Sequence, residues 1–120
     1  MYEEFAINDE MPVEERRGKI VDLLLHVRDT RPDLFDMSSW SVPRGECGTA
    51  HCVAGWVAVA HEDADEQAVR MKNGDWMNYY VLGRDMLSLT EGQADELFYN
   101  MEQTIDEAVA FIKDAPIHEP

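Results

Sequence analysis

Basic residues are scarce in this chain. Its 120 residues include 10 lysines and arginines against 25 aspartates and glutamates, which gives a formal net charge of −15 at pH 7. Proteins that bind the phosphate backbone of nucleic acids need clusters of Lys and Arg. Anionic membrane surfaces attract the same basic residues. We therefore expect neither nucleic acid nor a membrane as a direct partner.

Long hydrophobic runs are also missing. A membrane-spanning helix needs a run of about 18 or more apolar residues. The longest apolar run here, residues 52–60, is much shorter and is interrupted by Gly55. The acidic N-terminus has no basic segment followed by an apolar one, so no secretory signal is expected. We expect a cytoplasmic protein with a packed core, because 45% of its residues are hydrophobic.

No alternating strand pattern of useful length and no internal repeat is present, whereas helical spacing recurs along the chain. Ile20, Leu23 and Val27 recur at helical spacing and predict an amphipathic helix over 12–30. Arg16 and Arg17 are expected on its opposite, polar face. Pro32 ends this helix, because the residue before a proline is pushed out of the α region.

Further helices follow from spacing and from capping signals. A short helix is expected over 64–72, and helical spacing resumes from Asp75 to Leu87. Thr90 with Gln93, and Thr104 with Glu107, have the spacing of capping boxes. The predicted fold is an all-α compact bundle of five or six helices around a central apolar helix at about 50–60. An acidic arm (1–11) precedes the single domain (12–115), and a frayed tail (116–120) follows it.

The densest group of special residues is CGTAHCVAGW, residues 47–56. Its first interpretation is structural: a tight backbone at Gly48 and a helix cap at Thr49 begin the central helix. Gly55 is expected to allow close approach of another helix, and Trp40 to close over the helix start. This structural motif comprises Trp40, Cys47, Gly48, Thr49, Cys52, Gly55 and Trp56.

The same segment leaves a chemical alternative open. Cys47 precedes a predicted helix N-terminus, which favours a thiolate, and a catalytic cysteine requires a histidine base such as His51 or His61. A disulfide between Cys47 and Cys52 is a further possibility, although thiols stay reduced in the cytosol. The C-x4-C spacing does not match the paired C-x2-C motifs of zinc sites. We expect no metal and no cofactor.

Acidic residues dominate the last third of the chain. No Lys or Arg lies between Arg84 and Lys113. Such a surface favours binding of a protein with a basic surface by electrostatic complementarity, and a nucleic-acid mimic is one subtype. Aromatic residues supply large contact area at such interfaces. The candidate partner-binding residues are Asp95, Glu96, Glu102, Asp106, Glu107, Trp76, Tyr79 and Tyr80.

Three segments together resemble a group of uncharacterised small proteins from actinobacteria, other bacteria and their phages. They are LFDMSSW, CGTAHCVAGW and LSLTEGQADELF, and they span more than half of the chain from Asp33 to Phe98. The resemblance implies an accessory, phage-type origin and no particular activity. The expected partner is then a host or defence protein, which the chain engages or inhibits in the host cytoplasm. The chain departs from the group at residues 1–11 and 61–75.

Overall fold

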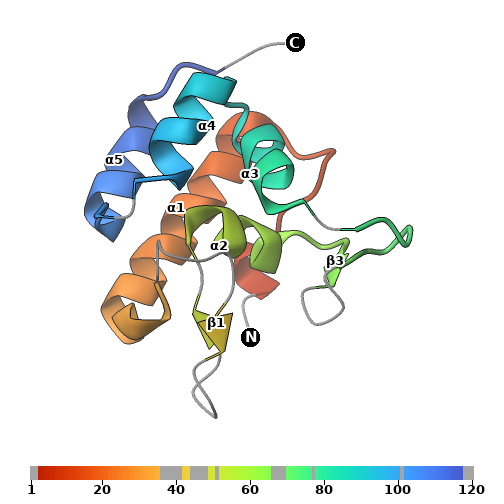
Figure 1. The fold of residues 1–120 in the computed structure, drawn as a ribbon, viewed down its shortest axis with the longest axis horizontal. Coiled ribbons are helices and arrows are strands. Elements are labelled where there is room, and N and C mark those ends of the chain that lie inside the picture. Colours follow the sequence, from red (N-terminus) through yellow and green to blue (C-terminus); the bar gives the residue numbers. More distant parts are fainter. Residues whose placement is uncertain are drawn as a thin grey trace.

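The computed structural model describes residues 3–35, 42–43, 49–50, 52–65, 70–76, 78–100 and 102–117. These ranges contain five α-helices: α1 (Val13–Thr30), α2 (Val53–Ala60), α3 (Tyr79–Leu87), α4 (Glu91–Phe98) and α5 (Ile105–Asp114). Two short 3-10 turns, η1 (Glu3–Phe5) and η2 (Pro32–Leu34), flank α1. Strands in the described ranges form only two antiparallel pairs, β1 (Val42–Pro43) with β2 (Thr49–Ala50) and β3 (Ala64–Asp65) with β4 (Arg70–Met71). The predicted all-α bundle is confirmed (Figure 1).

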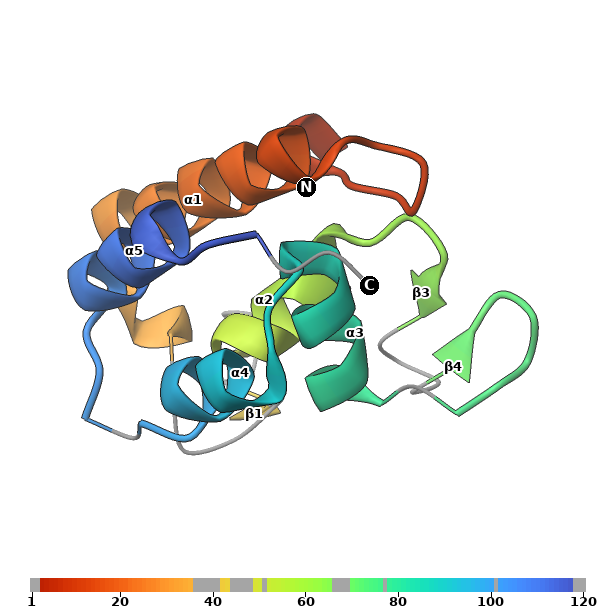
Figure 2. The same ribbon diagram turned by 90° about the horizontal axis from the view of Figure 1, so that it is seen from above.

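The apolar helix α2 is the centre of the bundle. It packs against α1, α3 and α4, and α1 in turn packs against α5 (Figure 2). Trp56 of α2 is 1% exposed, and its indole Nε1 donates a hydrogen bond to the carbonyl of Leu34 at 3.1 Å. This bond satisfies the polar edge of a tryptophan that is otherwise enclosed by the core.

The predicted start of the central helix is wrong by several residues. Thr49 and Ala50 pair with Pro43 and Val42 in the β1–β2 ladder, so the chain is still extended there. The helix begins at Val53, and its N-cap is Cys52, whose Sγ accepts a hydrogen bond from the Gly55 N–H at 3.5 Å. Strand pairing of residue 49 therefore excludes it as the N-cap of this helix.

The long first helix has the expected extent, but its arginines do not have the expected environment. α1 follows Pro12 and ends before Arg31, as the proline signals predicted. Arg16 and Arg17 were assigned to a polar face, yet each is only 8% exposed. They are buried because the C-terminal ends of α3 and α5 pack there, and helix ends carry carbonyls that lack a partner within the helix.

The segment between α2 and α3 differs from its prediction. No helix forms over 64–72 where the chain is described: residues 64–65 and 70–71 are the paired strands β3 and β4. α3 begins at Tyr79 rather than near Asp75, because the Asn78 side chain accepts a hydrogen bond from the Val81 N–H at 3.1 Å and caps the helix. Trp76 therefore lies outside the helix and is 70% exposed.

Three helices approach one another closely at Gly83 of α3. A Cβ atom at this position would lie 2.7 Å from Cζ of Phe98 and 3.3 Å from Cβ of Ala54. These residues belong to α4 and α2, so Gly83 marks the point where three helices meet. The sequence predicted a close approach at Gly55, which is buried within α2.

The two predicted capping boxes are present and fix the starts of α4 and α5. Thr90 accepts a hydrogen bond from the Gln93 N–H, and the Gln93 side chain accepts one from the Thr90 N–H. Thr104 and Glu107 repeat this arrangement. None of the helices in the described ranges is long and apolar enough to cross a membrane.

The N-terminal segment is attached to the core rather than surrounded by solvent. Ile7 is fully buried. Its N–H donates to the carbonyl of Ala60 at 2.9 Å, and its carbonyl accepts from the N–H of Glu62 at 3.0 Å. These bonds form a parallel bridge between Ile7 and His61 at the C-terminal end of α2.

Candidate functional site

Aromatic and acidic side chains gather where α3 meets α4. The rings of Tyr80 and Tyr99 are stacked, with their centroids 5.7 Å apart and their planes at 18°. The hydroxyl of Tyr80 donates to Oδ1 of Asp95 at 2.7 Å and contacts the carbonyl of Glu91 at 3.2 Å. Tyr99 is 57% exposed. We call Tyr80, Glu91, Asp95 and Tyr99 the acidic aromatic face.

The Tyr80 phenol is held in its neutral form. The hydrogen bond to Asp95, followed by burial and the nearby acidic charges, raises the pKa of Tyr80 to about 12. The ring also meets the edge of Phe98 in a T-shaped contact at 5.9 Å. Contacts with Phe98 and Asp95 thus hold the Tyr80 ring in one orientation. The exposed Tyr99 ring stacks against this ring.

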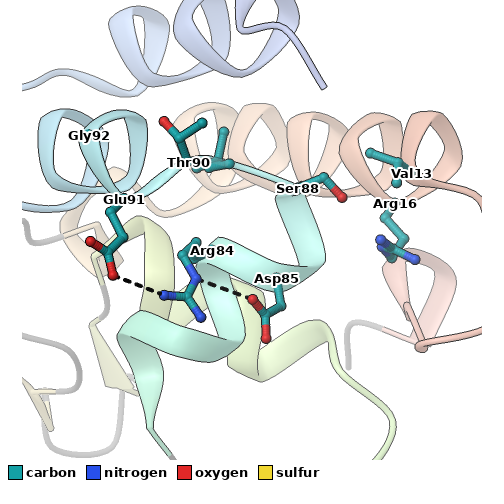
Figure 3. A pocket seen from close by; sticks show the side chains of 9 residues that line it. Val13, Arg16, Arg84, Asp85, Ser88, Thr90, Glu91 and Gly92 are labelled. Carbon is teal, nitrogen blue, oxygen red and sulfur yellow. Dashed lines mark hydrogen bonds and ion pairs between the residues drawn. The ribbon is translucent and has the colours of Figure 1, made fainter. Parts of the chain in front are cut away.

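Arg84 borders this face, and its positive charge is paired with two carboxylates. Its guanidinium lies 3.2 Å from Asp85 and 3.8 Å from Glu91, and it is 6.0 Å from the centroid of the Tyr80 ring. Figure 3 shows both ion pairs beside a cavity of about 940 Å³ between α1, α3 and the start of α4. Because both carboxylates face Arg84, the charge of this arginine is already paired. Arg16, the other arginine of the lining, donates to the carbonyls of Met86 and Met11.

The buried arginines of α1 have a structural role. Nε of Arg16 donates to the carbonyl of Met86 at 2.8 Å. Arg17 donates to the carbonyls of Leu87 at 2.7 Å and Ile112 at 3.2 Å, and also to that of Ala115. Burial lowers the pKa of Arg17, although the charge of Glu14 opposes this effect. Arg17 therefore joins the C-terminal ends of α3 and α5.

The other predicted partner-binding residues occupy several places. Glu96 and Glu102 are exposed. Asp106 pairs with Arg28 at 2.6 Å, and Glu107 belongs to a capping box. Trp76 lies under the guanidinium of Arg70, which is 3.9 Å from the ring centroid. Tyr79 is only 9% exposed and packs in the core, so it offers little surface to a partner.

Most residues of the candidate thiol site lie outside the part of the chain that the structure describes. Trp40, Cys47, Gly48 and His51 lie there, and of Thr49 only the backbone is described. Cys52 is buried at the start of α2. Within the described ranges, no group of three or more His, Cys, Asp and Glu side chains is arranged to hold a metal ion.

His61, the other candidate base, is a buried link between two segments. Its Nε2 lies 2.8 Å from Oδ1 of Asp9, and its Nδ1 accepts a hydrogen bond from the Asp63 N–H at 3.1 Å. An Nδ1 that accepts a hydrogen bond carries no proton, so Nε2 is the nitrogen that donates to Asp9. Both ring nitrogens are therefore engaged in holding the N-terminal segment against the end of α2.

Sequence reasoning placed Tyr80 and Asp95 among the candidates but missed Tyr99 and Glu91. Both could have been found from the sequence, because positions 91, 95 and 99 recur at the i, i+4 spacing that places residues on one side of a helix. The burial of Arg16 and Arg17 could also have been predicted, because they lie one helical turn before the apolar Ile20 and Val21.

Comparisons with protein-family models, with curated proteins and with solved structures found no match to this chain.

Proposed function

We propose that this protein is a small acidic binding module, and that its acidic aromatic face engages a basic surface on another protein. The observation that carries the proposal is the exposed Tyr99 ring, which is stacked on a Tyr80 held in place by Asp95. An aromatic side chain that is already oriented before binding loses little conformational freedom in a complex. Tyrosine is among the residues most often found at binding hot spots.

The charge distribution supports a basic partner. Seven acidic residues and no Lys or Arg lie between Arg84 and Lys113 in the sequence. A surface dominated by one sign of charge steers an oppositely charged protein toward it and raises the association rate. In its finer form, the proposal is that this chain inhibits a nucleic-acid-binding protein. Its own carboxylates would then occupy the phosphate-binding surface of that protein. The resemblance to phage proteins makes a bacterial host or defence protein the first partner to seek.

The test is an affinity pull-down from a bacterial lysate, followed by affinity measurement with the purified partner. Tyr99→Ala and Asp95→Asn are the test variants. Glu10→Gln removes an exposed acidic charge that does not belong to this face, so it is the matched control. We expect losses of about tenfold or more for the test variants, as for hot-spot residues, and weaker binding at higher salt.

Two results would count against this function. A partner whose affinity is unchanged by Tyr99→Ala and Asp95→Asn does not use this face. An affinity that is the same at low and high salt shows that charge complementarity is not involved.

A further inference from the structure

The corner between the end of α2 and the strand pair β3–β4 is built around one enclosed histidine. The side chain of His61 is 1% exposed. Its Nε2 lies 2.8 Å from Oδ1 of Asp9, and its Nδ1 accepts a hydrogen bond from the N–H of Asp63 at 3.1 Å. Figure 2 shows the red N-terminal segment meeting the light green chain that leaves α2. A single ring therefore links the N-terminal segment, the end of α2 and the start of β3.

The two hydrogen bonds of this ring require its neutral form. A neutral imidazole has one donor nitrogen and one acceptor nitrogen, and these match the carboxylate of Asp9 and the N–H of Asp63. A protonated imidazole donates from both nitrogens. The Nδ1–H of a protonated His61 would then face the N–H of Asp63, which is also a donor. Because the ring is enclosed, the two donors cannot both keep their present positions.

The backbone around Asp63 attaches β3–β4 to the rest of the molecule. The N–H of Ala64 donates to the carbonyl of His61 at 3.2 Å, and the carbonyl of Asp63 accepts from the N–H of Lys72 at 2.7 Å. The exposed Trp76 is bridged to β4 and belongs to the same unit. Loss of the contact between Asp63 and the ring therefore acts on the start of the unit that carries Trp76.

Charged groups reach this corner from several segments. They are Asp9 of the N-terminal segment, Arg16 of α1, Glu62 and Asp63 of the ring's own segment, and Lys72 after β4. Arg16 donates to the backbone carbonyl of Asp9, and Lys72 lies 3.5 Å from the Asp63 carboxylate. Among the described residues, the carboxylate that pairs with the ring is that of Asp9. Protonation therefore strengthens the Asp9 contact, because a hydrogen bond between two charged groups is stronger than one to a neutral donor.

We propose that His61 is a pH-sensitive switch, in which protonation of Nδ1 breaks the hydrogen bond to Asp63 and loosens β3–β4 from the end of α2. The N-terminal segment stays attached, because its link to the ring through Asp9 survives protonation. Histidine is the side chain whose charge ordinarily changes between about pH 5 and 8. The switch does not involve the acidic aromatic face, so it is independent of the proposed function.

The experiment is NMR of the isotope-labelled full chain from about pH 8 to about pH 5, the range in which histidines titrate. The nitrogen shifts of the His61 ring report its protonation. Hydrogen exchange of the Asp63 amide, corrected for the ordinary effect of pH on exchange, reports the bond to Nδ1. His61→Asn cannot titrate, yet its short side chain can accept from the N–H two residues further on. His26→Asn is the matched control, since His26 packs against Phe5 on α1.

We expect the corrected exchange of the Asp63 amide to rise about tenfold as the ring is protonated, the scale of one lost hydrogen bond. The amide of Lys72 should follow it, whereas that of Ile7 should keep its protection. His61→Asn should abolish the pH dependence, and His26→Asn should leave it unchanged.

Three results would overturn the switch. One is a His61 ring that stays neutral throughout the titration. Another is a ring that becomes protonated while the exchange of Asp63 is unchanged, a measurement on the native chain that does not depend on any variant folding. The third is the same pH dependence in His61→Asn, which would assign the transition to another group.

Discussion

Phe98 of α4 packs directly over Gly83 of α3, where an added Cβ would lie 2.7 Å from the ring. We expect Gly83→Ala to destabilise the protein by about 1–3 kcal/mol, because overpacking a tight core forces side chains and backbone to shift. Gly18 in α1 is the matched control, since a Cβ there would meet nothing within 4 Å. Gly18→Ala is expected to stabilise by about 0.5–1 kcal/mol, because alanine has the higher helix propensity.

Urea denaturation of both variants measures these free energies of unfolding. Equal effects of the two substitutions would show that Gly83 is not constrained by Phe98 and Ala54, and that only helix propensity matters at both positions.

Arg17 holds the ends of α3 and α5 through carbonyl oxygens. Arg17→Met keeps much of the apolar stem but removes every donor, and we expect a loss of about 2–4 kcal/mol of stability from the unpaired buried carbonyls. Arg17→Lys should recover only part of this loss, because an ammonium cannot reproduce the planar fork of a guanidinium. Arg28→Met is the control, since Arg28 forms an exposed ion pair with Asp106, and it should have little effect. Similar losses in thermal melts of Arg17→Met and Arg28→Met would refute this role.

The phenol of Tyr80 should lose its proton at an unusually high pH. Its pKa is raised from 10.0 to about 12, with the hydrogen bond to Asp95 as the first cause. Because the folded state holds this proton more tightly than the unfolded state, its contribution to stability is complete below pH 10 and is lost as the pH rises toward about 12. Asp95→Asn should return the pKa of Tyr80 toward the value of about 10 for a free tyrosine.

Ultraviolet difference titration reports this shift, with Tyr80→Phe identifying the signal of that phenol. A Tyr80 pKa that stays the same after Asp95→Asn would exclude the carboxylate as the main cause.

The parts of the fold that depend on local signals were predictable. The extent of α1 follows from its apolar spacing and its flanking prolines, and α4 and α5 begin where their capping boxes place them. The N-cap at Thr49 and the helix over 64–72 were wrong, because antiparallel pairing with a nearby segment of the chain overrode local helix propensity. The burial of Arg16 and Arg17 depends on helix ends that approach from positions about 70 and more residues away.

The candidate site was predictable only in part, because it also depends on contacts between different helices. Helical spacing places Asp95 on α4, but the stacking of Tyr80 on Tyr99 also depends on how α3 packs against α4, which come into close contact at Gly83. This relationship is not contained in the spacing of residues along one helix.

The bridge between Ile7 and His61 has a consequence for how the sequence can diverge. The N-terminal segment is hydrogen-bonded, through Ile7 and Asp9, to the segment that begins at the end of α2. A replacement at Asp9 leaves His61 without its carboxylate, and a replacement at His61 leaves Asp9 without its donor. The two segments are therefore expected to evolve as one unit, in which a change on either side selects for a matching change on the other.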